Sequence, residues 1–280
     1  MIIGITNRLC LRLLQSLALL AIVHSVQASD SPRQAIGEAY DLHTEKLLYR
    51  ETYCSNGSPD ELEVFYRSHE DQLIARKLLD YSSGRVTPSF VQHNLHTSEV
   101  IEVKLHQGRL TMSVFDAGNA APKKIKSTQP GDRIPIVIDV GLDEFVRGNW
   151  DSLLAGKMKR FLYPFAERSR LVKLRIKPSA CFYQTETDQC FRLELSNWFL
   201  RMLIAPIELG YDPEMRRLKR YRGLSNIGDE NGSSLRVDIR YNYHKIPEFA
   251  CRVSDQALTD GIGIPELALL SRWQAGMLGQ

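Results

Sequence analysis

Apolar and polar residues alternate along much of this chain, which is the pattern of strands that bury one face and expose the other. The clearest pair spans residues 101–106 and 109–114. Gln107-Gly108 between them has the length of a two-residue hairpin turn, which would place Leu105 opposite Leu110. In that register the apolar positions all share one face: Ile101, Val103, Leu105, Leu110, Met112 and Val114.

Further strand patterns lie on both sides of this hairpin, separated by turn-forming residues. They cover residues 47–53, 62–67, 73–81, 134–140, 172–177, 191–195, 218–225 and 235–243. Residues 29–44 form a polar lead-in, residues 116–133 are typical of a loop, and residues 199–211 are a long apolar stretch. Ten or more short strands joined by turns predict an antiparallel sheet.

Near the middle of the chain the apolar period changes from two residues to about 3.6, which indicates one amphipathic helix over residues 142–154. Its apolar face consists of Leu142, Phe145, Val146, Trp150, Leu153 and Leu154. Asp143 and Glu144 suit the positive end of its dipole, and Gly156 suits its C-terminal cap. A second, C-terminal helix is expected over residues 265–277.

A single helix is too narrow to cover the apolar face of so many strands, so we expect the sheet to curl around it. The predicted fold is mainly β: a curled antiparallel sheet, half-barrel or barrel-like, with one central amphipathic helix. This geometry tends to leave an apolar cavity. We expect Phe145, Trp150, Leu153 and Leu154 to line that cavity.

The first residues have the features of a cleaved export signal. Arg8 and Arg12 precede an apolar run that ends in Val26-Gln27-Ala28, so residues 1–28 are predicted to be a signal peptide. A membrane anchor is the alternative, but the run is shorter than the roughly 20 residues that span a bilayer. The remaining residues, 29–280, are predicted to be a single mainly-β domain. Its sheet and helix core covers residues 44–245, and residues 246–280 form a C-terminal extension.

The charge balance changes when the signal peptide is removed. Of 36 basic and 33 acidic residues, two arginines lie in residues 1–28, which leaves a net charge of +1. This balance gives no reason to expect nucleic acid as a partner. Two basic stretches, residues 157–160 and 216–222, could meet lipid head groups or an envelope protein, and a solvated face is the plainer interpretation.

Four cysteines remain after the signal peptide: Cys54, Cys181, Cys190 and Cys251. In an oxidising compartment they permit two disulfides, with three pairings. A bond between Cys181 and Cys190 fits a hairpin in which Ile176 lies opposite Leu195. Unpaired or differently paired thiols remain the alternative.

Three groups of residues could carry chemistry, and each has a plainer interpretation. His93 and His96 lack enough convergent partners for a metal site. Residues 223–227 begin like the G-x-S-x-G turn of a serine hydrolase but end in Ile227 instead of glycine. The third group is a set of carboxylates that suit a helix start: Asp139, Asp143 and Glu144. We therefore assign no catalytic residue, no metal ligand and no cofactor, and expect no enzyme.

Several segments together resemble a known class of proteins. They are Leu47-Leu48-Tyr49-Arg50-Glu51, Leu73-Ile74-Ala75-Arg76-Lys77, the helix at 142–154 and the segment 218–226. The pattern resembles uncharacterised exported proteins of Gram-negative bacteria and, more distantly, the half-barrel of the periplasmic lipoprotein carriers LolA and LolB. The resemblance implies a protein that holds a lipid or acyl chain in an apolar groove. The loop at 116–133 and the tail after Tyr243 have no counterpart in that half-barrel.

The expected function is a periplasmic binding or carrier protein for a lipid or other apolar ligand, without catalysis. One alternative is a structural or envelope-assembly factor that acts through its surface. An enzyme of unrecognised type would need titratable groups with shifted pKa values in a cleft. A membrane β-barrel is a further alternative, which the helix at 142–154 fits poorly.

Overall fold

The computed structural model describes residues 34–251, except residues 56, 117, 118, 120, 132, 230, 231, 244, 245 and 247. The predicted signal peptide at 1–28 and the predicted helix at 265–277 lie outside the described residues. The described part is mainly β, as predicted, and forms one antiparallel sheet of fourteen strands.

The strands follow one another along the chain in two groups. The first group is β1 (Ala35–Asp41), β2 (Leu47–Cys54), β3 (Glu61–Ser68), β4 (Leu73–Asp80), β5 (Ser89–Asn94), β6 (Glu99–His106), β7 (Arg109–Asp116) and β8 (Lys124–Thr128). The second is β9 (Lys159–Phe165), β10 (Arg170–Pro178), β11 (Gln189–Leu195), β12 (Ile207–Asp212), β13 (Arg217–Gly228) and β14 (Ser234–Asn242). The helices are α1 (Gly141–Gly148), α2 (Trp150–Leu154) and α3 (Trp198–Leu203), with short 3₁₀ turns η1 (Ala166–Arg168) and η2 (Glu248–Cys251).

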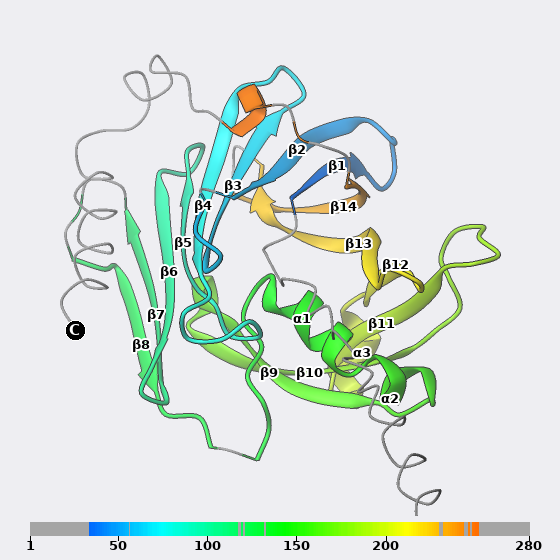
Figure 1. Ribbon diagram of the computed structural model, residues 1–280. Coiled ribbons are helices and arrows are strands. Elements are labelled where there is room, and N and C mark those ends of the chain that lie inside the picture. The colour runs from blue at the N-terminus through cyan, green and yellow to red at the C-terminus, as the bar shows by residue number, and fades with distance from the viewer. Residues whose placement is uncertain are drawn as a thin grey trace, which may run out of the picture. The chain divides into compact units, whose positions relative to one another are not determined.

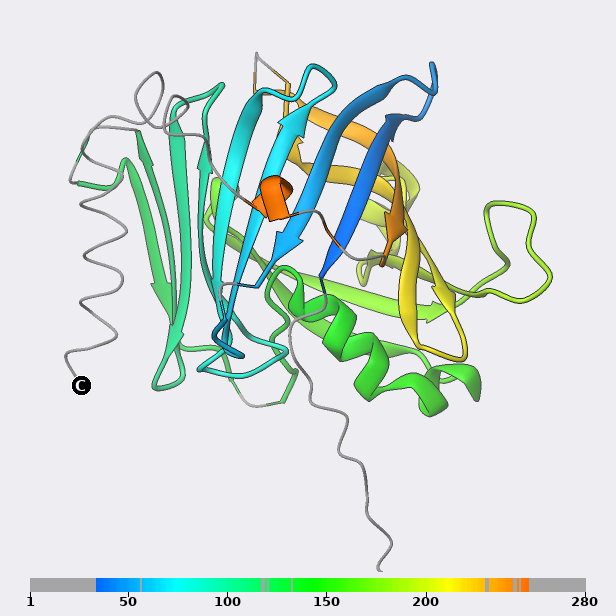
Figure 2. The same ribbon diagram turned by 45° about the horizontal axis from the view of Figure 1, so that its top comes forward.

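The two groups of strands join at β1, which pairs with β2 on one side and with β14 on the other. The sheet is open, with β8 and β9 as its outermost strands. It curls strongly, and α1 and α2 lie across one end of the curl (Figures 1 and 2). At the β9 end, η1 lies beside β6 and β7, and Lys124 of β8 donates a hydrogen bond to the Glu167 carbonyl at 3.2 Å. The sheet therefore bends far enough to bring its two ends together.

The β6–β7 hairpin has the predicted register. Leu105 lies opposite Leu110 and Val103 opposite Met112. Gln107 and Gly108 both have positive φ, at 47° and 72°, as a type I′ turn requires. The six apolar side chains point to the inner, concave face, where the main core of the first group of strands lies.

The predicted helix at 142–154 is two shorter helices, α1 and α2, that meet at Asn149. Gly148 and Asn149 are weak helix formers, and the Asn149 side chain donates to the Phe145 carbonyl at 2.8 Å. A side chain that bonds to the backbone in this way competes with regular helical hydrogen bonds. Gly156 ends the second helix with a φ of +78°, as expected of a C-terminal cap.

Five strands lie where the sequence pattern predicts none: β1, β5, β8, β9 and β12. β1 falls within the predicted polar lead-in, so the sheet begins before residue 44. Its inward positions are Ala35, Gly37 and Ala39, which are buried but too small to give an apolar signal. β8 falls within the predicted loop at 116–133 and is an exposed edge strand. The strand predicted over residues 134–140 is wrong, because that segment holds only an isolated bridge from Ile136 to Leu162 before α1 begins.

The four cysteines form two disulfides, Cys181–Cys190 and Cys54–Cys251. The strand register next to the first bond differs by two residues from the predicted one, since Ile176 lies opposite Leu193. Residues 179–188 form an irregular loop rather than a continuous hairpin, which accounts for this shift. No helix in the described part of the chain is long and apolar enough to cross a membrane.

Candidate functional site

A cavity of about 580 Å³ lies inside the curl of the sheet. One wall comes from β2 to β6, the opposite wall from β10 to β14, and α1 lies at one end. Apolar side chains cover much of both walls: Leu62, Ile74, Phe90, Ile101, Leu193 and Leu209. The cavity is therefore the space that the concave face of the sheet leaves unfilled.

A buried ion pair, Lys77 with Asp139, lies beside the cavity wall formed by β4. Lys77 lies at an inward position of β4 and is 0% exposed. Its Nζ is 2.7 Å from Oδ2 of Asp139, which lies just before α1 and reaches the cavity. The other Asp139 oxygen accepts the Val140 N–H at 2.9 Å. The close partner and this hydrogen bond offset part of the free energy that it costs to remove the two groups from water.

A buried carboxyl group lies on the β1–β2 side of the cavity. Glu51 accepts hydrogen bonds from Tyr241 at 2.6 Å and from Tyr53 at 3.1 Å. Burial raises the pKa of Glu51, and the two tyrosine hydrogen bonds oppose that shift. Gly37 lies opposite Glu51 on β1, where an added Cβ would come within 2.8 Å of the Glu51 Cγ. The small residue on β1 thus makes room for the carboxyl.

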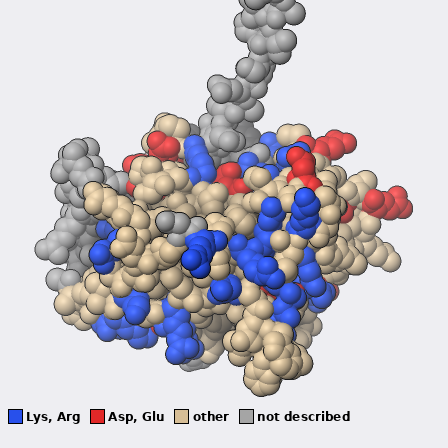
Figure 3. Space-filling model, turned by 90° about the horizontal axis from the view of Figure 1, so that it is seen from below, with Lys and Arg blue, Asp and Glu red and all other residues tan. Residues whose placement is uncertain are grey.

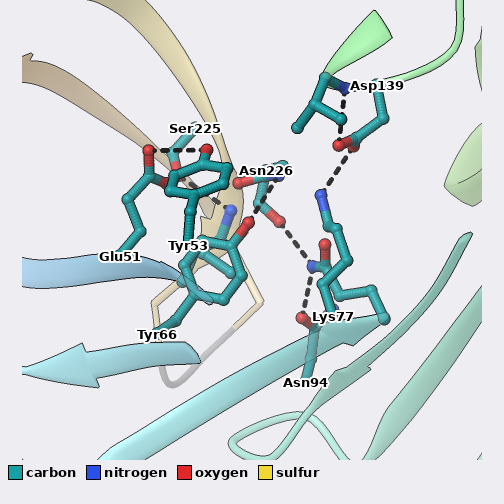
Figure 4. A network of polar contacts seen from close by, with 11 residues as sticks. Glu51, Tyr53, Tyr66, Lys77, Asn94, Asp139, Ser225 and Asn226 are labelled. Carbon is teal, nitrogen blue, oxygen red and sulfur yellow. Dashed lines mark hydrogen bonds and ion pairs between the residues drawn. The ribbon is translucent and has the colours of Figure 1, made fainter. Parts of the chain in front are cut away.

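Amide and hydroxyl groups lie between Glu51 and Asp139 and form hydrogen bonds of their own (Figure 4). The register of β13 shifts between Leu224 and Gly228, and in this irregular stretch Ser225 and Asn226 line the cavity. Ser225 shares a 2.7 Å hydrogen bond with the hydroxyl of Tyr49.

Two amides form further hydrogen bonds on the opposite wall. The side chain of Gln92 donates to Asn94 Oδ1 at 2.7 Å and to the Asn226 carbonyl at 3.1 Å. The Asn226 amide lies 3.4 Å from the Tyr66 hydroxyl. These bonds join β5 to β13, which are not neighbours in the sheet. They hold polar groups at fixed positions on a surface that also carries apolar side chains and charged ones, such as Arg85, Glu99 and Arg168.

The four helix residues that the sequence analysis predicted to line the cavity do not line it. Phe145, Trp150 and Leu153 are buried in a packed cluster against β9 to β12. Leu154 is 49% exposed at the surface. The cavity is lined instead by another side of α1, including Leu142 and Arg147, with Arg147 paired to Asp143 and Glu144.

Most of the other candidate residues from the sequence also line this cavity: His96, Asp139, Asp143, Glu144 and Ser225. His93 is on β5, with its side chain buried, and His96 follows that strand at the cavity. The described residues hold no group of three or more His, Cys, Asp or Glu side chains that could bind a metal ion. Ser225 sits on a strand rather than on a strand-to-helix turn, with Tyr49 as its side-chain partner.

Sequence reasoning missed two buried ionisable side chains, Glu51 and Lys77. Both side chains point to the inner face of the sheet. On β2, Glu51 shares that face with Tyr49 and Tyr53, two residues before and two residues after it. A charged residue in the apolar phase of a strand was the signal that could have identified them, because charged side chains are rarely buried without a partner.

No protein-family model matches the chain, and none of the curated proteins compared with it matches. Among solved structures it is similar to a crystal structure from Brucella abortus, described as a β-barrel-like protein of domain of unknown function DUF1849. The two chains are 11% identical with a TM-score of 0.41, and the similarity covers 77% of this chain and 97% of the other.

Proposed function

We propose that this chain is an exported, periplasmic binding or carrier protein that holds a lipid or other largely apolar small molecule inside its curled sheet, without catalysis. The cavity of about 580 Å³ carries this proposal. Its size falls within the roughly 300–1,000 Å³ of small-molecule sites, and its walls combine apolar area with a few fixed polar groups, as such sites do.

The charges around the cavity indicate which part of a ligand would enter it. Lys77 and Asp139 neutralise each other, and a raised pKa favours the neutral form of Glu51. An unpaired charge brought into such a place would lose its hydration without compensation. The part of the ligand that lies beside these groups is therefore uncharged: an apolar body with at most a hydroxyl, amide or ester that bonds to the polar groups around Asn226. Other charged side chains line the cavity elsewhere, among them Arg85, Lys124 and Arg168.

Export is part of the same proposal. Two disulfides join four cysteines in the structure, and such bonds persist mainly in oxidising compartments. The experiment is fractionation of expressing cells followed by thiol labelling without reductant. We expect the protein in the periplasmic fraction with no reactive thiol, and recovery in the cytoplasm with free thiols would contradict the proposal.

Binding is tested by titrating the purified protein with a fluorescent fatty-acid analogue. Two isoleucines on the same sheet give a matched pair of variants: Ile101 lines the cavity and is 3% exposed, whereas Ile125 on β8 is 63% exposed. Ile101→Trp adds bulk inside the cavity, and we expect it to weaken binding at least about tenfold. Ile125→Trp is expected to bind like the wild type.

Circular dichroism of both variants checks that the fold is retained. If neither wild type nor variant binds the probe, the carrier function is wrong. If both variants bind as the wild type does, the probe binds outside the cavity and the assignment of the site fails. Turnover of the probe into a product would favour an enzyme, with Glu51 as the first residue to examine.

A further inference from the structure

The helix α3 exposes apolar side chains that a folded protein usually buries. It connects β11 to β12, and none of its six residues is buried. Trp198, Met202 and Leu203 are 66–68% exposed, and Phe199 is 53% exposed. Ile204, directly after the helix, is 47% exposed. A run of large apolar residues exposed around most of a helix marks an interaction site.

Local hydrogen bonds hold this helix in place at its base. The Asn197 side chain caps it by accepting the N–H groups of Phe199 at 2.9 Å and Leu200 at 3.3 Å. The backbone N–H of Ser196 donates to the Lys173 carbonyl at 2.9 Å, which ties the start of the helix to β10. The Arg201 guanidinium donates to the Ser196 carbonyl at 3.4 Å. The apolar tip is therefore a built element of the fold.

The strands next to this tip present a basic surface. Side chains that alternate with the buried ones on β9, β10 and β11 point to the convex face, and they include Arg160, Lys173, Arg175, Lys177 and Arg192. The acidic residues among them are already paired, Glu194 with Arg175 and Lys177, and Glu208 of β12 with Arg192 at 3.2 Å. Figure 3 shows Lys and Arg side chains gathered on the face seen from below, where Figure 1 places β9 and β10.

We propose that α3 docks onto the surface of a lipid bilayer that contains anionic lipid, with its apolar side chains in the interfacial region and the basic residues against the head groups. Trp and Phe beside aliphatic side chains, next to Lys and Arg, are the composition of interfacial anchors. This surface is separate from the cavity, so the inference stands whether or not the cavity binds a ligand.

A protein partner fits the same feature less well. A specific protein interface usually takes about 20–30 residues from each side. The apolar tip has only five apolar residues in α3, which are exposed around most of the helix, while Arg201 lies half-buried on the remaining side. A fluid bilayer needs no complementary shape and can surround such a tip, while the adjoining positive charge accounts for a preference for anionic lipid.

Sedimentation of the purified protein with vesicles tests this inference. Vesicles of phosphatidylglycerol and phosphatidylethanolamine are compared with vesicles of phosphatidylcholine. We expect binding to the first, weakened by added salt, together with a blue shift of Trp198 fluorescence. The double variant Phe199→Ser/Leu203→Ser keeps that tryptophan and should lower the partition coefficient by roughly tenfold or more. Lys173→Gln should lower it about fivefold, the effect of one basic residue near an anionic surface.

Ile125→Ser is the matched control, because it removes an equally exposed apolar side chain from a distant edge strand, and it should leave binding unchanged. Equal binding by the α3 double variant, or no binding by the wild type, would overturn the inference. So would a dimer that forms without lipid and is lost in the double variant, since a second copy would then cover the tip.

Discussion

Replacement of Lys77 by methionine tests the buried ion pair most severely. Methionine has a similar length and is apolar, so Lys77→Met keeps most of the packing beside Phe90, whose ring centroid lies 5.1 Å from the ammonium group. The change leaves Asp139, with its side chain only 8% exposed, without its partner at 2.7 Å. An uncompensated buried charge of this kind costs about 3–5 kcal/mol of unfolding free energy.

The double variant Lys77→Met/Asp139→Asn separates lost pairing from lost packing. Asparagine keeps the acceptor for the Val140 N–H and tolerates the positive φ of 45° at this position. Because no charge is left buried, we expect the double variant to recover at least about half of the loss. With the single variant Asp139→Asn measured as well, the cycle should give a coupling energy of roughly 2 kcal/mol or more.

Urea unfolding followed by circular dichroism, without reductant so that both disulfides stay intact, gives the free energies. A loss below about 1 kcal/mol for Lys77→Met would mean that the charge on Asp139 is not buried as described. A loss in the double variant equal to the sum of the losses in Lys77→Met and Asp139→Asn would mean that the two residues do not interact.

Three further predictions follow from particular contacts. Burial raises the pKa of Glu51 above its ordinary value of 4.5, so the unfolded chain loses this proton at a lower pH than the folded protein does. The free energy of unfolding of the wild type should therefore fall as pH rises from 4.5 to the folded pKa. In thermal scans, the melting temperature of Glu51→Gln relative to that of the wild type should rise from about pH 4 to pH 8. The Cys54–Cys251 bond closes a loop of 197 residues and the Cys181–Cys190 bond a loop of only nine. Replacing both cysteines of a pair by serine should therefore lower the free energy of unfolding, measured in urea, by about 5 kcal/mol for the first bond and about 2.5 kcal/mol for the second. The reverse order would contradict the chain-entropy argument. A Cβ on Gly141 would lie 2.2 Å from the Val86 carbonyl oxygen, so Gly141→Ala should lower the free energy of unfolding in urea by about 2–3 kcal/mol. A Cβ on Gly148 would have no atom within 4 Å, so Gly148→Ala should leave that free energy unchanged or raise it.

The sequence was most informative where strand alternation and turn chemistry agree. The hairpin around Gln107-Gly108 has the predicted register because a one-residue slip would move every apolar side chain to the wrong face. The curl of the sheet could also be predicted, because one helix is too narrow to cover the apolar face of so many strands.

Elements without an apolar signal could not be found in this way. β1 buries only alanine and glycine at its inward positions, and its place in the sheet depends on pairing with β14, some 200 residues further along the chain. The apolar stretch at 199–211 shows the opposite case. Its first half is the exposed α3 and its second half is the partly buried β12, a difference that depends on tertiary packing rather than on composition.

The candidate site was the hardest part to predict. The sequence indicated a cavity but assigned its lining to the apolar face of the helix, which packs against β9 to β12 instead. The polar lining of the cavity comes from strands far apart in sequence, as in the hydrogen bond from Gln92 to the Asn226 carbonyl. Such convergence follows from the curl of the sheet and has no local signature.

Native mass spectrometry of the protein purified from a periplasmic extract tests the central claim most directly. We expect a complex heavier than the chain, which releases a lipid or other largely apolar molecule on denaturation and forms less readily with Ile101→Trp. A protein that shows only its own mass, even after incubation with membrane extract, would contradict the claim that the cavity is a binding site.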